Sequence, residues 1–416
     1  MAFETRLVLG ATLIATALAG CGGGGGGDDD SGVPPPDPTP TSKFTQSASW
    51  TVALPAAGGA RCYDFDTQTE VADCSGSNWD LKVESGGRSA ALWTNSGVSG
   101  AGRGGAFGGP FDRNWTELST WQDATVDPVD GAMPAAVYFA DSANGVFTGT
   151  NPTGVAAFEY DLSGQHQFHP NYRVFLITTD SSSADAIGTP AAPVYALQVI
   201  GYYGGPTGTA SGYPTIRWVD RSAPAVVRTE TIDASSNTAW TYFDLTTGTV
   251  VPESGTWHIA FNRYNVKLNG GDSGTGNVAG YVGKTPAGLY DANGAPITSA
   301  FLAATPATTL AELTAADIAV PTRAQDWVED EFSSQLQADY RGTYPQPLDF
   351  GWYVYYPTAQ AAQAAGLAAT AHLLAANPEG AALLRSGEGN SYARFHVTKI
   401  EYADPSNFNS AQTWTI

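Results

Sequence analysis

The segment Trp257-His258-Ile259-Ala260-Phe261-Asn262 decides the fold class, because its large apolar side chains stand at every second position. A strand places successive side chains on opposite faces, so this period of two is typical of a half-buried strand. Similar short segments recur along the chain, separated by Gly, Asn, Asp and Ser, which favour turns. The sequence therefore predicts an all-β protein of antiparallel strands.

An internal repeat organises these strands, because segments of the first half recur in the same order in the second half. The matched segments are Phe65-Asp66-Thr67-Gln68-Thr69 with Phe243-Asp244-Leu245-Thr246-Thr247, Trp79-Asp80-Leu81 with Trp257-His258-Ile259, Ser99–Gly102 with Ser273–Gly276, and Val174–Ile177 with Ala381–Arg385. The first two pairs align without a gap. This order predicts two tandem antiparallel β-rich modules, residues 44–225 and 226–416.

One stretch departs from the strand pattern. Thr358 to Leu374 is rich in Ala and Gln, which favour helix, and Asn377-Pro378 follows it as a stop signal. We expect an Ala-rich helix inserted in the second module.

The overall composition excludes one class of partner. The chain has 416 residues, enough for two or three domains with their own cores. Acidic residues outnumber basic ones 40 to 19, for a net charge of −21. This charge repels a phosphate backbone, so we expect no nucleic-acid partner.

The N-terminus carries an export signal. Arg6 precedes an apolar run, Leu7 to Ala17, which is too short to span a membrane and predicts a signal peptide over residues 1–20. The following Leu18-Ala19-Gly20-Cys21 resembles a bacterial lipobox, which implies lipidation of Cys21; ordinary secretory cleavage is the alternative. Residues 21–43 are rich in Gly, Asp and Pro and predict a tether that holds the folded part off the lipid surface.

Two cysteines remain once Cys21 is assigned to lipid. Exported cysteines meet an oxidising compartment, and Cys62 and Cys74 flank a turn, Asp66 to Thr69, between two expected strands. The spacing predicts a disulfide that staples a hairpin. A zinc site would need two further ligands, and residues 61–80 contain no His.

Several motifs together resemble the HmuY-like haem-binding lipoproteins, a family of haemophores. They are Trp240 to Arg263, with its Trp-x-Ile-x-Phe-x-Arg strand, the turn Asn269 to Gly276, Gly351 to Tyr356 before a Pro, Tyr392 to Val397 and, in the first copy, Phe158 to Tyr203. The resemblance implies a non-enzymatic lipoprotein of the Gram-negative outer membrane, anchored on its periplasmic or outer face. Such a protein captures haem and passes it to a TonB-dependent receptor.

Haem iron needs axial ligands with a lone pair, commonly His or Met. The resemblance points to His166, in a loop shortly before Pro170, as an iron ligand. His169 is an alternative ligand, and Met133 is the candidate for a second one. No metal other than haem iron is expected.

The expected haem pocket surrounds this loop. Phe168 and Tyr172 are its expected walls, while Arg173 and Arg103 are candidates for binding the haem propionates on grounds of charge. The second module has Ala359 and Gln360 where the loop His should come, so the first module is the expected site.

The three other histidines are expected to have structural or surface positions. His258 should lie on the outward face of its strand as a structural or exposed residue, and His396 should face solvent. His372 should lie on the Ala-rich helix, without a partner ligand four residues further on.

A second class of function stays open. A surface adhesion or carbohydrate-binding β-sandwich would use exposed Trp115 and Trp121 as stacking platforms for sugars. We find no Gly-x-Ser-x-Gly elbow and no phosphate loop, so no enzyme is predicted.

Overall fold

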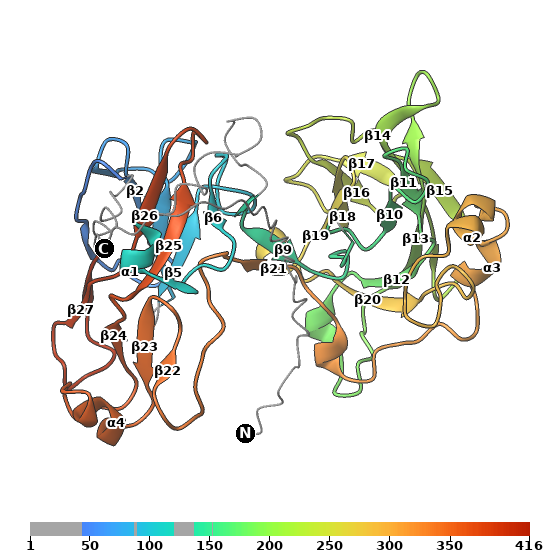
Figure 1. Ribbon diagram of the computed structural model, residues 1–416. Coiled ribbons are helices and arrows are strands. Elements are labelled where there is room, and N and C mark those ends of the chain that lie inside the picture. The colour runs from blue at the N-terminus through green and yellow to red at the C-terminus, as the bar shows by residue number, and fades with distance from the viewer. Residues whose placement is uncertain (1–43, 87–89, 120–136, 152) are drawn as a thin grey trace, which may run out of the picture. The chain divides into compact units, whose positions relative to one another are not determined.

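Antiparallel strands make up most of the regular structure in the computed structural model, which describes residues 44–86, 90–119, 137–151 and 153–416 (Figure 1). The helices of these residues are short: α1 (Trp115–Leu118), α2 (Thr298–Ala303), α3 (Leu310–Leu313) and α4 (Ala359–Ala364). The all-β prediction is confirmed. None of the helices in the described ranges is long and apolar enough to cross a membrane.

Two four-stranded sheets show the repeat in three dimensions. The first has the order β3 (Thr69–Val71), β2 (Ala60–Asp64), β4 (Leu81–Ser85), β5 (Ala90–Thr94). The second has the order β17 (Thr249–Val251), β16 (Thr241–Asp244), β18 (Ile259–Asn262), β19 (Asn265–Leu268). Both sheets thus have the same strand order.

The register of the first hairpin corrects the gapless alignment. Asp64 pairs with Thr69 in the same way as Asp244 pairs with Thr249, so Asp64 is the counterpart of Asp244. The gapless alignment had instead matched Asp66 with Asp244. The connection from β3 to β4, which contains Cys74, is longer than the equivalent connection from β17 to β18. That difference restores the predicted match of Trp79 with Trp257.

The remaining strands form two further groups around two hydrophobic cores. One group contains β15 (Arg228–Thr231), β14 (Ala210–Asp220), β13 (Val194–Gly204), β12 (Val174–Thr178) and β20 (Ala279–Lys284) in this order, and the pair β10 (Phe158–Tyr160) and β11 (Phe168–Pro170). Its core takes buried residues from 146 to 278.

The other group joins strands from both ends of the chain. Its sheets are β26 (Tyr392–Phe395), β25 (Gly380–Arg385), β6 (Gly105–Phe107) and β8 (Tyr138–Phe139), with β7 (Arg113–Asn114) also on β25; β22 (Leu348–Asp349), β23 (Tyr353–Tyr356) and β24 (Leu373–Ala376); and β1 (Thr51–Ala53), β28 (Gln412–Thr415) and β27 (Lys399–Tyr402). The red strands β25, β26 and β27 of Figure 1 belong to this group. Its core combines residues 50–111 with residues 336–414.

The two copies of the repeat therefore exchange their C-terminal halves. β1 pairs with β28 and β6 with β25, whereas β20 of the second copy pairs with β12 of the first. The exchange occurs at β9 (Ser142–Asn144) and β21 (Glu331–Ser333), which pair with each other. The predicted boundary near residue 225 separates the two copies in the sequence. In the structure, strands of each copy are hydrogen-bonded to strands of the other.

The predicted long helix is much shorter than expected. Only Ala359–Ala364 is helical, with Thr358 as N-cap accepting from the N–H of Ala361. Gly366 has φ +80°, a left-handed conformation that ends a helix, and β24 occupies residues that the sequence assigned to helix. The strand pairing of β24 with β23 overrides the helical preference of Ala and Leu.

The exchange makes a direct prediction for a cross-linked variant. Thr51 lies opposite Thr415, so Thr51→Cys with Thr415→Cys should form an intramolecular disulfide on oxidation, seen as a mobility shift on a non-reducing gel. The matched pair Thr51→Cys with Thr215→Cys, which would join β1 to β14 of its own copy, should stay reduced. The exchange of halves would be contradicted if the Thr51→Cys/Thr215→Cys pair formed the disulfide and the Thr51→Cys/Thr415→Cys pair stayed reduced.

Candidate functional site

His166 lies at the tip of the β10–β11 hairpin. Its side chain is 79% exposed, and its Nδ1 is 3.7 Å from the Asp161 carboxylate. The N–H of His166 donates to Asp161 Oδ1 at 2.7 Å, and both residues have positive φ. Asp161 therefore fixes the loop conformation that presents the imidazole to solvent.

An aromatic cluster lies at the base of this loop. Tyr160 is the neighbour of the His166 ring, with centroids 6.2 Å apart, and it also contacts Phe168. Phe168 packs on Tyr202 and stacks on Tyr264 at 4.7 Å. The tip thus places an exposed imidazole beside the ring of Tyr160, which in turn contacts Phe168.

His169 belongs to the other face of the same hairpin. It follows Phe168 in β11, so its side chain points away from the aromatic cluster, and it pairs across the hairpin with Glu159. Its Nε2 is buried and has no hydrogen-bond partner within the described ranges, and burial lowers the pKa of the ring. His166 and His169 therefore do not converge on one point.

Tyr172 and Arg173 lie in the connection between β11 and β12. Tyr172 is buried in a small apolar cluster with Leu289 and Phe301. Arg173 donates to the carbonyl of Ala156 and lies over the ring of Tyr290 at 5.1 Å. Neither residue belongs to the cluster of rings beneath His166.

The other predicted positions divide into two sets. Met133, Cys21, the signal peptide and the tether lie outside the described residues. Cys62 and Cys74 form the predicted disulfide, with Cα atoms 5.6 Å apart.

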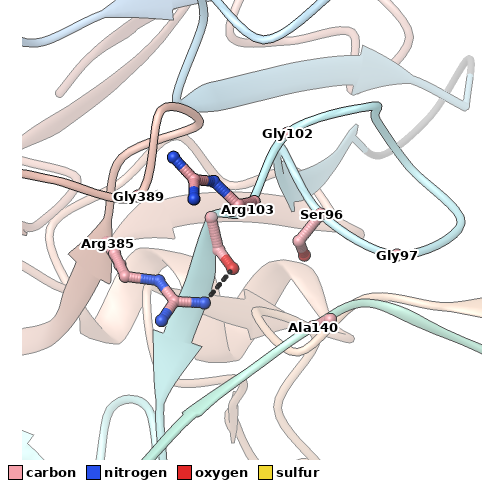
Figure 2. A pocket seen from close by; sticks show the side chains of 8 residues that line it. Ser96, Gly97, Gly102, Arg103, Ala140, Arg385 and Gly389 are labelled. Atoms are coloured by element: carbon pink, nitrogen blue, oxygen red, sulfur yellow. Dashed lines mark hydrogen bonds between the residues drawn. The ribbon is translucent and has the colours of Figure 1, made fainter. Parts of the chain in front are cut away.

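A pocket of about 370 Å³ lies elsewhere, between the turn that follows β5 and the turn that follows β25 (Figure 2). Ser96, Arg103 and Arg385 contribute polar side chains to its wall, and Ala140 and four glycines complete the lining. Arg103 is thus the one predicted haem residue that lines this pocket.

The structure places a second histidine in the same position as His166. Asn171 and Asn377 make equivalent hydrogen bonds, and the pairing of Tyr160 with Phe168 corresponds to that of Tyr355 with Leu374. Counting from these pairs, His372 is the counterpart of His166. It is exposed, it has φ +69° against +55°, and its ring lies 6.0 Å from Tyr355, the counterpart of Tyr160.

His372 corrects the expectation that the second copy lacks the loop His. The sequence placed this residue on a helix, because the Ala-rich insertion separates it from Tyr355. The insertion lengthens the loop instead, and the chain returns to the same pairing. A clue in the sequence was available, since His372 stands just before the strand that precedes Asn377, as His166 stands just before the strand that precedes Asn171.

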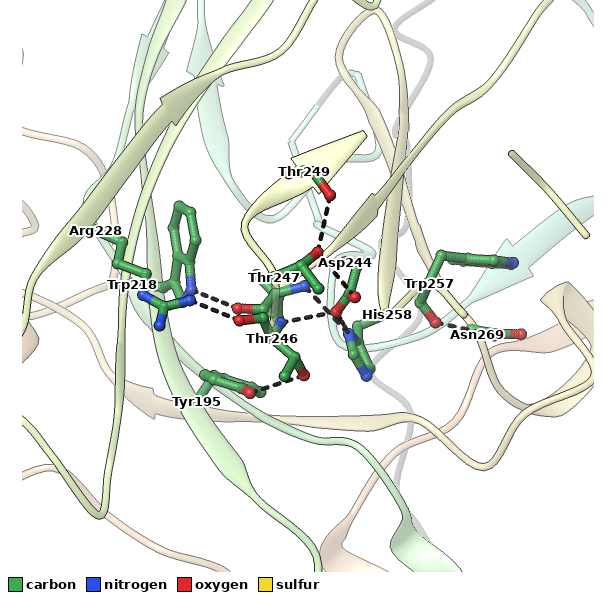
Figure 3. Close-up of polar contacts among 11 residues, drawn as sticks. Tyr195, Trp218, Arg228, Asp244, Thr246, Thr247, Thr249, Trp257, His258 and Asn269 are labelled. Carbon is green, nitrogen blue, oxygen red and sulfur yellow. Dashed lines mark hydrogen bonds and ion pairs between the residues drawn. The ribbon is translucent and has the colours of Figure 1, made fainter. Parts of the chain in front are cut away.

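His258 is buried, which corrects the outward orientation expected for it, although its structural role is confirmed. Its Nδ1 lies 3.1 Å from Asp244 Oδ1 and accepts from the N–H of Leu245 (Figure 3). Burial lowers the pKa of His258, while Asp244 opposes that shift.

His396 also has protein partners. Its ring stacks on Trp115 at 3.8 Å, and Arg394 lies over the Trp115 ring at 3.7 Å. A platform for stacking sugars needs open ring faces, whereas the Trp115 ring is in contact with His396 and Arg394. Trp121 lies outside the described residues.

Three carboxylates gather at the counterpart of His258 in the first copy. Asp64, Asp66 and Asp80 have oxygens within 4.8 Å of one another. The two carboxylate oxygens of Asp80 accept hydrogen bonds from the backbone N–H groups of Phe65 and Gly387. Burial raises the pKa of Asp80 to about 7, although those hydrogen bonds oppose the shift.

The fold and its exposed loop histidines define an all-β protein with two copies of one histidine-bearing hairpin. Residues 236–412 match the model of the HmuY protein family, so this stretch of the chain is HmuY-like. This matched stretch is the second copy of the repeat and contains His372. No curated protein and no solved structure matches the chain. The family match indicates a haem-binding or haemophore-like function.

Asp80 predicts an unusual dependence of stability on pH. Its pKa of about 7 exceeds the ordinary value of 3.8, so the folded state holds the proton more tightly than the unfolded chain. This contribution is complete below pH 4 and is lost as the pH rises through 7, by up to roughly 4 kcal/mol. We expect the free energy of unfolding, measured with denaturant at pH 5 and pH 8, to fall less between these pH values for Asp80→Asn than for the unmutated chain.

Asp66→Asn is the matched control, because Asp66 is exposed and belongs to the same cluster. It should keep the fall in unfolding free energy between pH 5 and 8. An equal fall in Asp80→Asn and the unmutated chain would contradict the assignment.

Proposed function

We propose that this chain is a haem-binding lipoprotein that takes up haem at His166 and, in the second copy, at His372. The observation that carries the proposal is the occurrence of an exposed histidine at the same hairpin position in both copies, each beside a tyrosine ring. The HmuY family match over residues 236–412 supports haem as the ligand.

The chemistry of these histidines suits an iron ligand. A histidine that binds a metal through one ring nitrogen usually donates from the other to a second partner. His372 Nδ1 lies 2.6 Å from Tyr355 Oη, a hydrogen-bond distance, and His166 Nδ1 lies 3.7 Å from the Asp161 carboxylate, an ion-pair distance. In both cases Nε2 is the nitrogen for iron.

Aromatic faces supply the apolar contact that a porphyrin requires. Tyr160 and Phe168 serve this role near His166. Near His372 the rings are Tyr355, the counterpart of Tyr160, and Phe408, whose centroid is 5.2 Å from that of the imidazole. The sites thus share an architecture and differ in their rings.

The wider role rests on the predicted N-terminus. Lipidation of Cys21 anchors the chain to the outer membrane, and the tether of residues 21–43 extends the two copies away from it. The bound haem then passes to a TonB-dependent receptor. The protein acts by binding and transfer, without catalysing a reaction.

Haemin titration of the full chain tests the proposal. We expect a sharpened Soret band that saturates at two haemins per chain, because each copy carries one loop histidine. His166→Ala and His372→Ala should each remove one equivalent, and the double variant should remove both.

His396→Ala is the matched control, since His396 is also partly exposed but stacks on Trp115. It should keep two equivalents. No spectral change with the unmutated chain would overturn the haem proposal, whereas an unchanged titration in the double variant would overturn the ligand assignment.

A further inference from the structure

The pocket of Figure 2 gathers positive charge in an acidic chain. The chain has 19 basic and 40 acidic residues, yet the charged side chains that line this pocket are Arg103 and Arg385. Figure 2 shows both guanidinium groups beside the wall formed by Ser96 and Gly102. Neither arginine has a carboxylate within 4.0 Å among the residues that the structure describes, and Glu388 forms no ion pair with them there.

Both arginines are held in place by backbone carbonyls. Arg103 Nη2 donates to the carbonyl of Glu388 at 2.7 Å, and Arg385 Nη2 donates to the carbonyl of Gly104 at 3.3 Å. Arg385 Nε is buried and has no hydrogen-bond partner among the described residues. A buried donor without an acceptor is costly, so this N–H indicates a missing acceptor.

The two copies of the repeat differ at this pocket. Gly102 and Gly276 make the same hydrogen bond to Asn95 and Asn269, so Arg103 corresponds to Asn277. Arg385 lies opposite Gly105 as Thr178 lies opposite Ala279, so Arg385 corresponds to Thr178. The shared fold therefore forms without either arginine. Each copy contributes one arginine to this pocket, and the equivalent place where β12 pairs with β20 has Asn277 and Thr178 instead.

We propose that this pocket binds the oxyanion group of a small molecule, a carboxylate or a phosphate. A guanidinium group presents several N–H donors in a plane that matches two oxygens of such a group. The volume of about 370 Å³ suits a small molecule. The bound oxygens satisfy Arg385 Nε and neutralise both charges, and the site is separate from His166 and His372.

Calorimetric titration of the full chain with citrate, and separately with inorganic phosphate, tests this site. We expect saturable binding of at least one probe. Arg385→Thr and Arg103→Asn introduce the residue types of their counterparts, Thr178 and Asn277. Each variant should weaken binding about tenfold or more, because each removes a charge-assisted contact. Binding of citrate alone identifies a carboxylate site, and binding of phosphate alone identifies a phosphate site.

Arg221→Asn is the matched control, because Arg221 is exposed and lies away from the pocket lining. It should bind as the unmutated chain does. Arg103 is also exposed, so Arg103→Asn tests the pocket even if Arg385→Thr disturbs folding, which its near-ultraviolet circular dichroism would reveal. The proposal would be overturned if neither citrate nor phosphate binds, or if Arg103→Asn binds with the same affinity as the unmutated chain.

Discussion

Two buried aspartates, Asp141 and Asp330, fix the points on which the rest of the structure depends. Asp141 Oδ2 accepts from the N–H of Thr94 at 2.9 Å, and its Oδ1 accepts from the N–H of Gln335 at 2.8 Å. Asp330 Oδ2 accepts from Leu268, the counterpart of Thr94. Burial raises the pKa of both carboxyls, and their hydrogen bonds oppose it. A buried carboxylate without such donors would be strongly destabilising, so the chain must reach these partners.

The exchange of halves follows directly from these anchors. Each aspartate ends the N-terminal half of its copy, and β9 or β21 follows at once. Because Asp141 also binds the N–H of Gln335, the first half of copy one is joined to the second half of copy two. The proposed haem ligands are thereby divided. His166 lies on the hairpin whose Phe168 packs against the core of residues 146–278, and His372 precedes β24, whose Leu374 belongs to the core that joins both ends of the chain.

Duplication has left the two copies free to differ in chemistry while keeping one fold. His258 pairs with Asp244 in one copy, whereas Asp80 meets Asp64 in the other. Arg103 and Arg385 replace Asn277 and Thr178 in a similar way. The hairpin histidine is retained in both copies, and this retention is what makes it the better candidate for a shared function.

The sequence by itself determined the β class, the repeat and the Cys62–Cys74 disulfide, because alternation, turn residues and short-range spacing are local properties. It also pointed to Phe168 and His166, which lie on one short hairpin and both contact Tyr160. It missed His372, because an inserted loop hid the match, and it left His258 on the wrong face. Only the tertiary structure decided which halves pair, because the hydrogen bonds of Asp141 and Asp330 and the β1–β28 pairing join residues far apart in the chain.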